Sequence, residues 1–195
     1  MDRKSEEPTV EPLYHPDTVG QSFACQLYGW LQPVLAALAV LVLSLFIGRF
    51  IGVQGDSMLP TLQNGNLVLL QSALYTPQNG DVVVVATHAF SNDTPIIKRI
   101  IAKGGQTVAV DYATSTVYVD GEPIPEPYLG EDMVLVPDQF AGEYPITVPE
   151  GHLFIMGDNR NHSSDSRRSA IGLVDERAAL GKALWVVFPF GSVDK

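Results

Sequence analysis

The stretch PIIKRIIAK, residues 95–103, places two adjacent cations inside a run of isoleucines. Successive side chains of a strand point to opposite faces, so Lys98 and Arg99 project in opposite directions, each among apolar neighbours. We therefore expect one of the two cations to lie against apolar surface. Burial lowers the pKa of a lysine from about 10.4 by up to several units, whereas an arginine stays protonated. Lys98 is thus a candidate general base and Arg99 its structural or electrostatic neighbour.

The alternative is that Lys98 reaches solvent from an edge strand and Arg99 pairs with a surface carboxylate.

Short apolar runs bounded by turn residues occur on both sides of this stretch. Segments 106–112 and 115–120 predict a β-hairpin, with DGEPIP as the next turn. After residue 52 we find no helical periodicity of about ten residues or more, apart from a short turn at 174–180. The pattern favours a mainly β domain over 52–195, built as two packed antiparallel sheets or a partly closed barrel. Further predicted strands are LVLLQ from Leu67, DVVVVAT from Asp81, MVLVP from Met133, YPITVP from Tyr144, HLFIMGD from His152 and GKALWVVFPF from Gly181.

A second stretch, GDSMLPTL at residues 55–62, sets Ser57 between a tight glycine turn and a proline. A serine hydroxyl is a weak nucleophile at neutral pH and needs a positioned base. The chain has four histidines, of which His88 is nearest to Ser57 in sequence, and no carboxylate pattern orients any of them. Lys98 is therefore the better candidate base. Taken alone, a serine in a Gly-Asp-Ser turn is an ordinary turn residue.

A third stretch, MGDNRNHSSDSR at residues 156–167, follows an apolar strand with a loop rich in hydrogen-bonding side chains. Alone, it fits either a solvated connection or a calcium loop. Calcium is disfavoured because Arg160 and Arg167 stand among the would-be ligands, and the loop lacks the expected glycine and terminal glutamate. We predict no metal and no cofactor.

Composition excludes several classes of function. The formal net charge of -10 and the absence of a basic patch argue against a nucleic-acid partner, because phosphate binding needs clustered lysine and arginine. Cys25 is the only cysteine of the 195 residues, so no internal disulfide and no cysteine-pair metal cluster is possible.

The N-terminal part of the sequence differs from the rest. Residues 1–26 are polar and acidic with three prolines, which predicts a disordered tail. Residues 27–51 are mostly apolar and long enough to cross a hydrocarbon layer of about 30 Å, which predicts a transmembrane helix. Bulky apolar residues follow the run, so we expect an uncleaved anchor. Arg3 and Lys4 on the N-terminal side outnumber Arg49 near the other end of the run, which predicts that the N-terminus lies in the cytoplasm.

Four stretches together resemble the bacterial type I signal peptidases, which are membrane-anchored Ser-Lys endopeptidases. VQGDSMLPTL at 53–62, GDVVVV at 80–85, KRIIAKGG at 98–105 and the loop at 156–167 occur in the family's order. The resemblance covers most of residues 30–190. The chain resembles the compact members of the family, which lack a large inserted β subdomain. The resemblance implies a single transmembrane helix followed by an antiparallel β-sheet catalytic domain.

The resemblance also implies a role for each matching residue. Ser57 is the nucleophile that forms the acyl-enzyme, and Lys98 is the general base. Ser163 hydrogen-bonds and orients the lysine ammonium. Asp165 and Arg167 form a pair that braces this part of the site.

For the oxyanion hole we expect backbone N–H groups, from Ser57 and from Gly55. Some relatives carry a hydroxyl two positions before the nucleophile, where this chain has Gly55, so the identity of the second donor stays open. Met58 is predicted to contact the substrate, with packing in the core as the alternative. The sequence AKGGQ at 102–106 also lacks the proline and aspartate of the usual family turn.

By this resemblance the substrates are secretory preproteins, cut at the outer face of the cytoplasmic membrane by a single-pass protein with an extracytoplasmic catalytic domain. Small residues at the first and third positions before the cut are expected to fill shallow pockets. Two alternatives remain at this point. One is a self-cleaving repressor, which would carry a DNA-binding domain in place of the apolar helix, and the other is an inactive membrane-tethered β-domain that serves as a scaffold.

Overall fold

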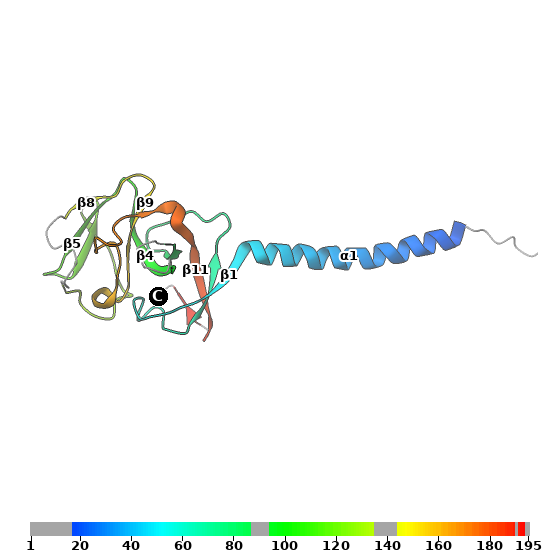
Figure 1. Cartoon of the computed structure of the whole chain (residues 1–195), viewed down its shortest axis with the longest axis horizontal. Helices are drawn as coiled ribbons and strands as arrows, with labels where there is room; N and C mark the ends of the chain where they lie inside the picture. Colours follow the sequence, from blue (N-terminus) through cyan, green and yellow to red (C-terminus); the bar gives the residue numbers. More distant parts are fainter. Residues whose placement is uncertain (1–16, 87–93, 135–143, 190, 194–195) are drawn as a thin grey trace, which may run out of the picture. The chain divides into compact units, whose positions relative to one another are not determined.

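The computed structural model describes residues 17–86, 94–134, 144–189 and 191–193 (Figure 1). The chain divides into two compact units, Met1–Ser44 and Leu45–Lys195. The first unit contains most of one helix, and the second contains all the strands.

Helix α1 spans Asp17–Ile47 and is continuous through Pro33. It begins inside the predicted polar tail, whose residues 1–16 lie outside the described residues. Of the helical residues whose side chains are described, all are exposed, including Val34, Leu38 and Leu41. Within the described residues we find no helix with both the length and the apolarity that crossing a bilayer requires.

The predicted apolar helix ends earlier than expected, because Gly48–Gly52 forms strand β1 instead. β1 pairs antiparallel with β2, residues Leu67–Gln71, with Phe50 opposite Leu69. A Cβ at Gly48 would lie 2.8 Å from Leu69 Cδ1, so a larger residue there would require the leucine side chain to shift. Apolarity alone does not separate a helix end from a buried strand, which is why the sequence placed residues 48–51 in the helix.

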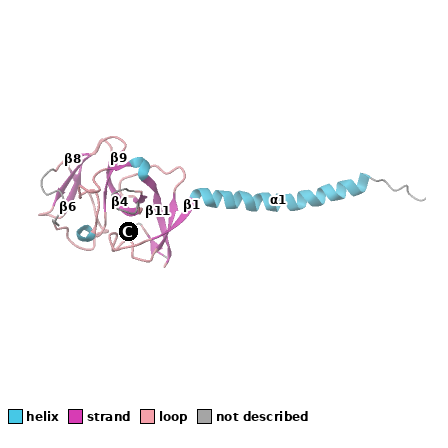
Figure 2. Cartoon of the chain, viewed as in Figure 1, coloured by secondary structure: helices cyan, strands magenta, loops and turns pink. Residues whose placement is uncertain are grey.

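Two antiparallel sheets make up the second unit (Figure 2). The larger is eight-stranded with the order β1-β2-β11-β3-β4-β9-β10, and β12 pairs with β11. The smaller is four-stranded with the order β7-β6-β5-β8. The remaining strands of the larger sheet are β3 Val82–Val85, β4 Ile96–Lys103, β9 His152–Met156, β10 Val174–Asp175, β11 Ala179–Phe188 and β12 Gly191–Ser192; those of the smaller are β5 Thr107–Asp111, β6 Thr116–Val119, β7 Glu122–Pro123 and β8 Ile146–Thr147.

The structure confirms most of the predicted strands. β5 and β6 form the expected hairpin, with Val110 opposite Val117. The short turn expected at 174–180 is split between β10, the 3-10 helix Glu176–Ala178 and the start of β11. Of the predicted strand MVLVP, only Met133 and Val134 are among the described residues, and these two are not in a strand.

Strand β4 is an interior strand of the larger sheet. It pairs with β3 on one side and with β9 on the other. Its isoleucines and alanine take part in all three hydrophobic clusters: Ile97 packs on the first, Ile101 belongs to the second and Ile100 to the third. The strand is therefore covered on both faces, and both Lys98 and Arg99 become buried.

Candidate active site

Ser57 and Lys98 are in direct contact. Lys98 Nζ donates a hydrogen bond of 2.7 Å to Ser57 Oγ and a second one of 2.9 Å to the carbonyl oxygen of Ile97. The lysine is 3% exposed and projects from the middle of the sheet, where Val83 of β3 lies opposite it. The 2.7 Å contact is within the range that direct proton transfer needs.

Burial changes the protonation of Lys98. Loss of hydration lowers its pKa to about 8, against the opposing attraction of Asp165 and Asp158, and the positive charge of Arg167 adds to the lowering. With that pKa roughly one lysine in ten is neutral at pH 7, compared with fewer than one in a thousand at the ordinary value. A neutral amine can accept the serine proton.

The backbone of Ser57 is held by the loop that follows β9. The N–H of Asn159 donates to the Ser57 carbonyl oxygen at 3.0 Å, and Asn159 Nδ2 donates to the Asp56 carbonyl oxygen, also at 3.0 Å. Two hydrogen bonds from one residue therefore fix the turn that carries the nucleophile.

Arg99 is also buried, at 5% exposure, although the sequence led us to expect this for only one of the two cations. Its guanidinium forms a bidentate pair with Asp158 at 2.9 and 2.7 Å and donates to the Gly80 carbonyl oxygen. The ring of Tyr128 lies 3.9 Å from the guanidinium carbon. These contacts compensate the charge of Arg99 inside the protein.

Asp165 and Arg167, for which the family resemblance implies a bracing role, form an ion pair. Arg167 Nε and Nη2 donate to the two carboxylate oxygens at 2.8 Å each, and both side chains are fully buried. Burial alone would raise the pKa of Asp165, but the hydrogen bonds and charge of Arg167 outweigh it and hold that pKa below its ordinary range. Asp165 also accepts the N–H of Gly157 at 3.0 Å.

Ser163 is placed beside this pair but makes no bond to the lysine. Its Oγ is buried and has no hydrogen-bond partner among the described residues. The hydroxyl still contributes to the lowered pKa of Asp165, although the contact falls outside hydrogen-bond geometry. The orienting role of Ser163 therefore stays a prediction.

Gly157 explains why Ser57 and Ser163 come so close. A Cβ at this glycine would lie 2.5 Å from the Ser57 carbonyl oxygen and nearer still to Ser163 Oγ. Contacts that short do not occur, so only glycine fits between the two serines. The sequence showed this glycine as part of a loop and gave no sign of its packing.

Gly55 and Met58 have other partners in the structure. The Gly55 N–H donates to Asn64 Oδ1 at 3.1 Å, so this amide already has an acceptor. Met58 is 2% exposed and belongs to the first hydrophobic cluster. Met58 therefore packs in the core, which was the alternative to the predicted contact with substrate.

A hollow of about 580 Å³ opens beside the Ser57–Lys98 pair. Ile51, Val84 and Ile97 are among its apolar lining residues, and Ser57 and Lys98 stand in its wall. The lining role of Ile51 was missed, because the sequence assigned this residue to the apolar helix. An apolar hollow with a nucleophile and a base in its wall is suited to bind a chain segment with apolar side chains and cut it.

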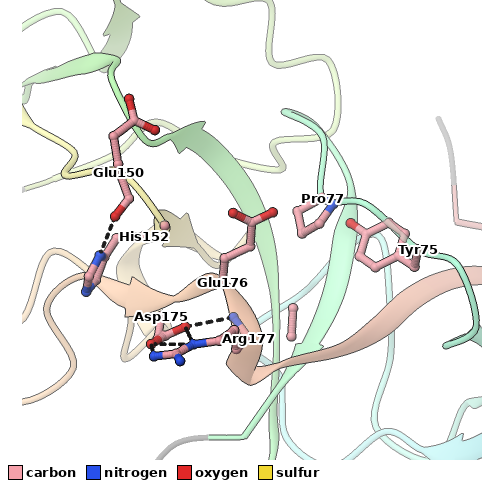
Figure 3. A pocket seen from close by; sticks show the side chains of 9 residues that line it. Tyr75, Pro77, Glu150, His152, Asp175, Glu176 and Arg177 are labelled. Carbon is pink, nitrogen blue, oxygen red and sulfur yellow. Dashed lines mark hydrogen bonds and ion pairs between the residues drawn. The ribbon is translucent and has the colours of Figure 1, made fainter.

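A second hollow of about 460 Å³ has four charged side chains among its nine lining residues: Glu150, Asp175, Glu176 and Arg177 (Figure 3). Arg177 pairs with Asp175, and His152 Nδ1 lies 3.2 Å from the carbonyl oxygen of Glu150. Its lining includes neither serine nor lysine. The described residues contain no group of three side chains placed to hold a metal ion.

Several known proteins that are similar to this chain are named for the same activity. The family model for signal peptidase, peptidase S26, matches residues 27–188. A signal peptidase I of Bacillus licheniformis is 34% identical over 180 residues, which cover 87% of this chain and 92% of the relative. A probable signal peptidase I-1 of Synechocystis sp. is 35% identical, over 80% and 79% of the two chains.

The solved structures that are similar include a signal peptidase I from Enterococcus faecalis V583, with 28% identity and a TM-score of 0.45. The match covers 56% of this chain and 98% of the other.

The buried ion pair Arg99–Asp158 and the exposed ion pair Arg177–Asp175 are expected to respond differently when the carboxylate charge is removed. Asp158→Asn removes the carboxylate charge that pairs with the buried Arg99 guanidinium, which is expected to destabilise the fold by about 3–5 kcal/mol. Asp175→Asn removes the same charge from a pair whose arginine is 90% exposed, and little change is expected. Denaturant unfolding of both variants measures the difference, and equal midpoints would contradict the buried pairing.

Proposed function

Because the chain belongs to the signal peptidase family, peptidase S26, we propose that it is a signal peptidase I, a serine endopeptidase that removes signal peptides from secretory preproteins. The observation that carries this proposal is the 2.7 Å contact between Ser57 Oγ and a buried Lys98 Nζ in the wall of an apolar hollow. No cofactor enters the proposed reaction.

In the proposed mechanism, neutral Lys98 takes the proton of Ser57 as Oγ attacks the scissile carbonyl carbon. The resulting lysine ammonium then protonates the leaving amine, which is the new N-terminus of the mature protein. An acyl-enzyme on Ser57 remains. Water, deprotonated by the same lysine, attacks this ester and releases the signal peptide, and the proton returns to Ser57.

The backbone N–H of Ser57 is the proposed first donor to the oxyanion. Gly55 can act as second donor only if its N–H leaves Asn64 Oδ1 when substrate binds. Loss of one such donor costs about 10²- to 10³-fold in rate in related chemistry.

Substrate recognition is proposed to lie in the hollow beside Ser57. Ile51 and Val84 come from separate strands and present branched apolar side chains there. Such walls suit small apolar residues of the signal peptide just before the cut, as the family resemblance implies.

We also propose that the protein is attached to a membrane through α1, with the N-terminus in the cytoplasm and the catalytic unit outside. In support of this, residues 31–47 contain no charged side chain. On the described part of the helix Leu31, Leu35 and Val40 are between 49% and 68% exposed, and water does not favour such an apolar surface. Ser57 follows Ile47 by about ten residues, a span of at most about 35 Å, which keeps the nucleophile within reach of a peptide in the bilayer.

Ser57→Ala and Lys98→Ala are each expected to abolish processing of a preprotein by the purified protein in detergent, because one removes the nucleophile and the other the base. The controls are Ser169→Ala, at an exposed serine, and Lys103→Ala, on the same strand as Lys98. Both controls should process normally. Substantial cleavage by either of the first two variants would refute the mechanism.

The rate of processing should depend on the protonation of Lys98. Only the neutral amine accepts the serine proton, so kcat/KM is expected to rise tenfold per pH unit on the acid side and to level off above a pKa of about 8. A pH–rate profile with a short peptide substrate measures this. If kcat/KM instead keeps rising to about pH 10.4, the pKa of Lys98 is not lowered by burial, and the proposed role of burial is wrong.

Membrane attachment is tested by adding charge to α1. Leu35→Glu together with Leu38→Glu is expected to move the protein out of the carbonate-washed membrane fraction, because each charge at the centre of a bilayer helix costs about 2.5–3.5 kcal/mol. Leu74→Glu, at a fully exposed leucine of the catalytic unit, is the control and should stay with the membranes. Unchanged fractionation of the double variant would contradict attachment through α1.

A further inference from the structure

Arg160 is a buried cation that the mechanism does not use. It is 1% exposed, and its guanidinium is held by Glu126 through two hydrogen bonds, one of 3.1 Å from Nη1 and one from Nη2. The side chain of Glu126 is only 7% exposed. An arginine cannot lose its proton in a protein, so Glu126 provides the charge that allows Arg160 to be buried.

The third nitrogen of Arg160 points to the site. Nε donates to the carbonyl oxygen of Gly157 at 3.1 Å, while the N–H of Gly157 donates to Asp165 at 3.0 Å. Both backbone polar groups of Gly157 are thus held by ion-paired side chains. This is the glycine whose Cα faces the Ser57 carbonyl oxygen and Ser163 Oγ.

Glu126 also reaches the strand that carries the lysine. Tyr128 donates its hydroxyl to Glu126 at 3.1 Å, and the same tyrosine ring packs against Arg99, the neighbour of Lys98. The segment 126–128 therefore contacts the loop under Ser57 through Arg160 and strand β4 through Arg99. It follows β7 of the smaller sheet, so these contacts link the site to a segment outside the larger sheet.

On the basis of the proposed function, we propose that Glu126 is a positioning residue for the Ser57–Lys98 dyad. It fixes the Arg160 side chain, which in turn fixes the Gly157 backbone against Ser57. Glu126 does not touch the reacting atoms. Its effect is on the geometry in which the lysine amine meets the serine hydroxyl, and a displacement of about 1 Å there lowers a rate by about 10²-fold.

The experiment compares Glu126→Gln, Arg160→Gln and the double variant, with kcat and KM measured on a short peptide substrate and unfolding followed by circular dichroism. Glu126→Gln keeps the shape of the side chain and removes the charge. We expect kcat to fall by about 10- to 100-fold with KM within about twofold of wild type. Glu122→Gln, at an exposed glutamate of β7, is the matched control and should retain the wild-type kcat.

The double variant separates positioning from stability. It has no unpaired buried charge, so its unfolding temperature is expected to return toward wild type, while kcat stays as low as in the single variants because the Gly157 carbonyl has lost its donor. A wild-type kcat in Glu126→Gln, or recovery of kcat together with stability in the double variant, would overturn the inference. If the wild-type protein does not cleave the peptide, the proposed function fails instead.

Discussion

The site depends on one constraint, which is the burial of the Lys98 amine on strand β4, whose side chains take part in hydrophobic clusters on both faces. Loss of hydration destabilises the charged ammonium form of Lys98 and so lowers its pKa. The Lys98 nitrogen lies 2.7 Å from Ser57 Oγ. No histidine is needed for such a pair. Of the described histidines, His152 lies in the charged hollow and not in the hollow beside Ser57.

The buried arginines show why Lys98 is the group that can lose its proton. Arg99, Arg160 and Arg167 are each paired with a carboxylate, and each pair includes at least one residue of the loop that begins at Gly157. The described ion pairs do not include Lys98, which bonds instead to a hydroxyl and a carbonyl oxygen. The three arginines stay charged beside their carboxylates, whereas the buried Lys98 amine can be either charged or neutral.

Local sequence patterns predicted the strands, the hairpin and the meeting of Ser57 with Lys98, because alternation and turn residues are local and the family motifs carry the dyad. They did not predict that residues 48–52 leave the apolar helix to pair with β2, since apolarity is the same in both states. They also missed Glu126, because its partner Arg160 is distant in sequence and EPIPEPYLG reads only as a turn region. The burial of both Lys98 and Arg99 likewise depends on which strands become neighbours of β4.

Direct titration of Lys98 tests the central claim. The Cε resonance of this residue, in protein carrying ¹³C-labelled lysine and assigned by its loss in Lys98→Arg, can be followed against pH in the folded protein. We predict a midpoint of about 8. A midpoint near the ordinary value of about 10.4 would show that burial does not prepare this amine as a base, and would contradict the account.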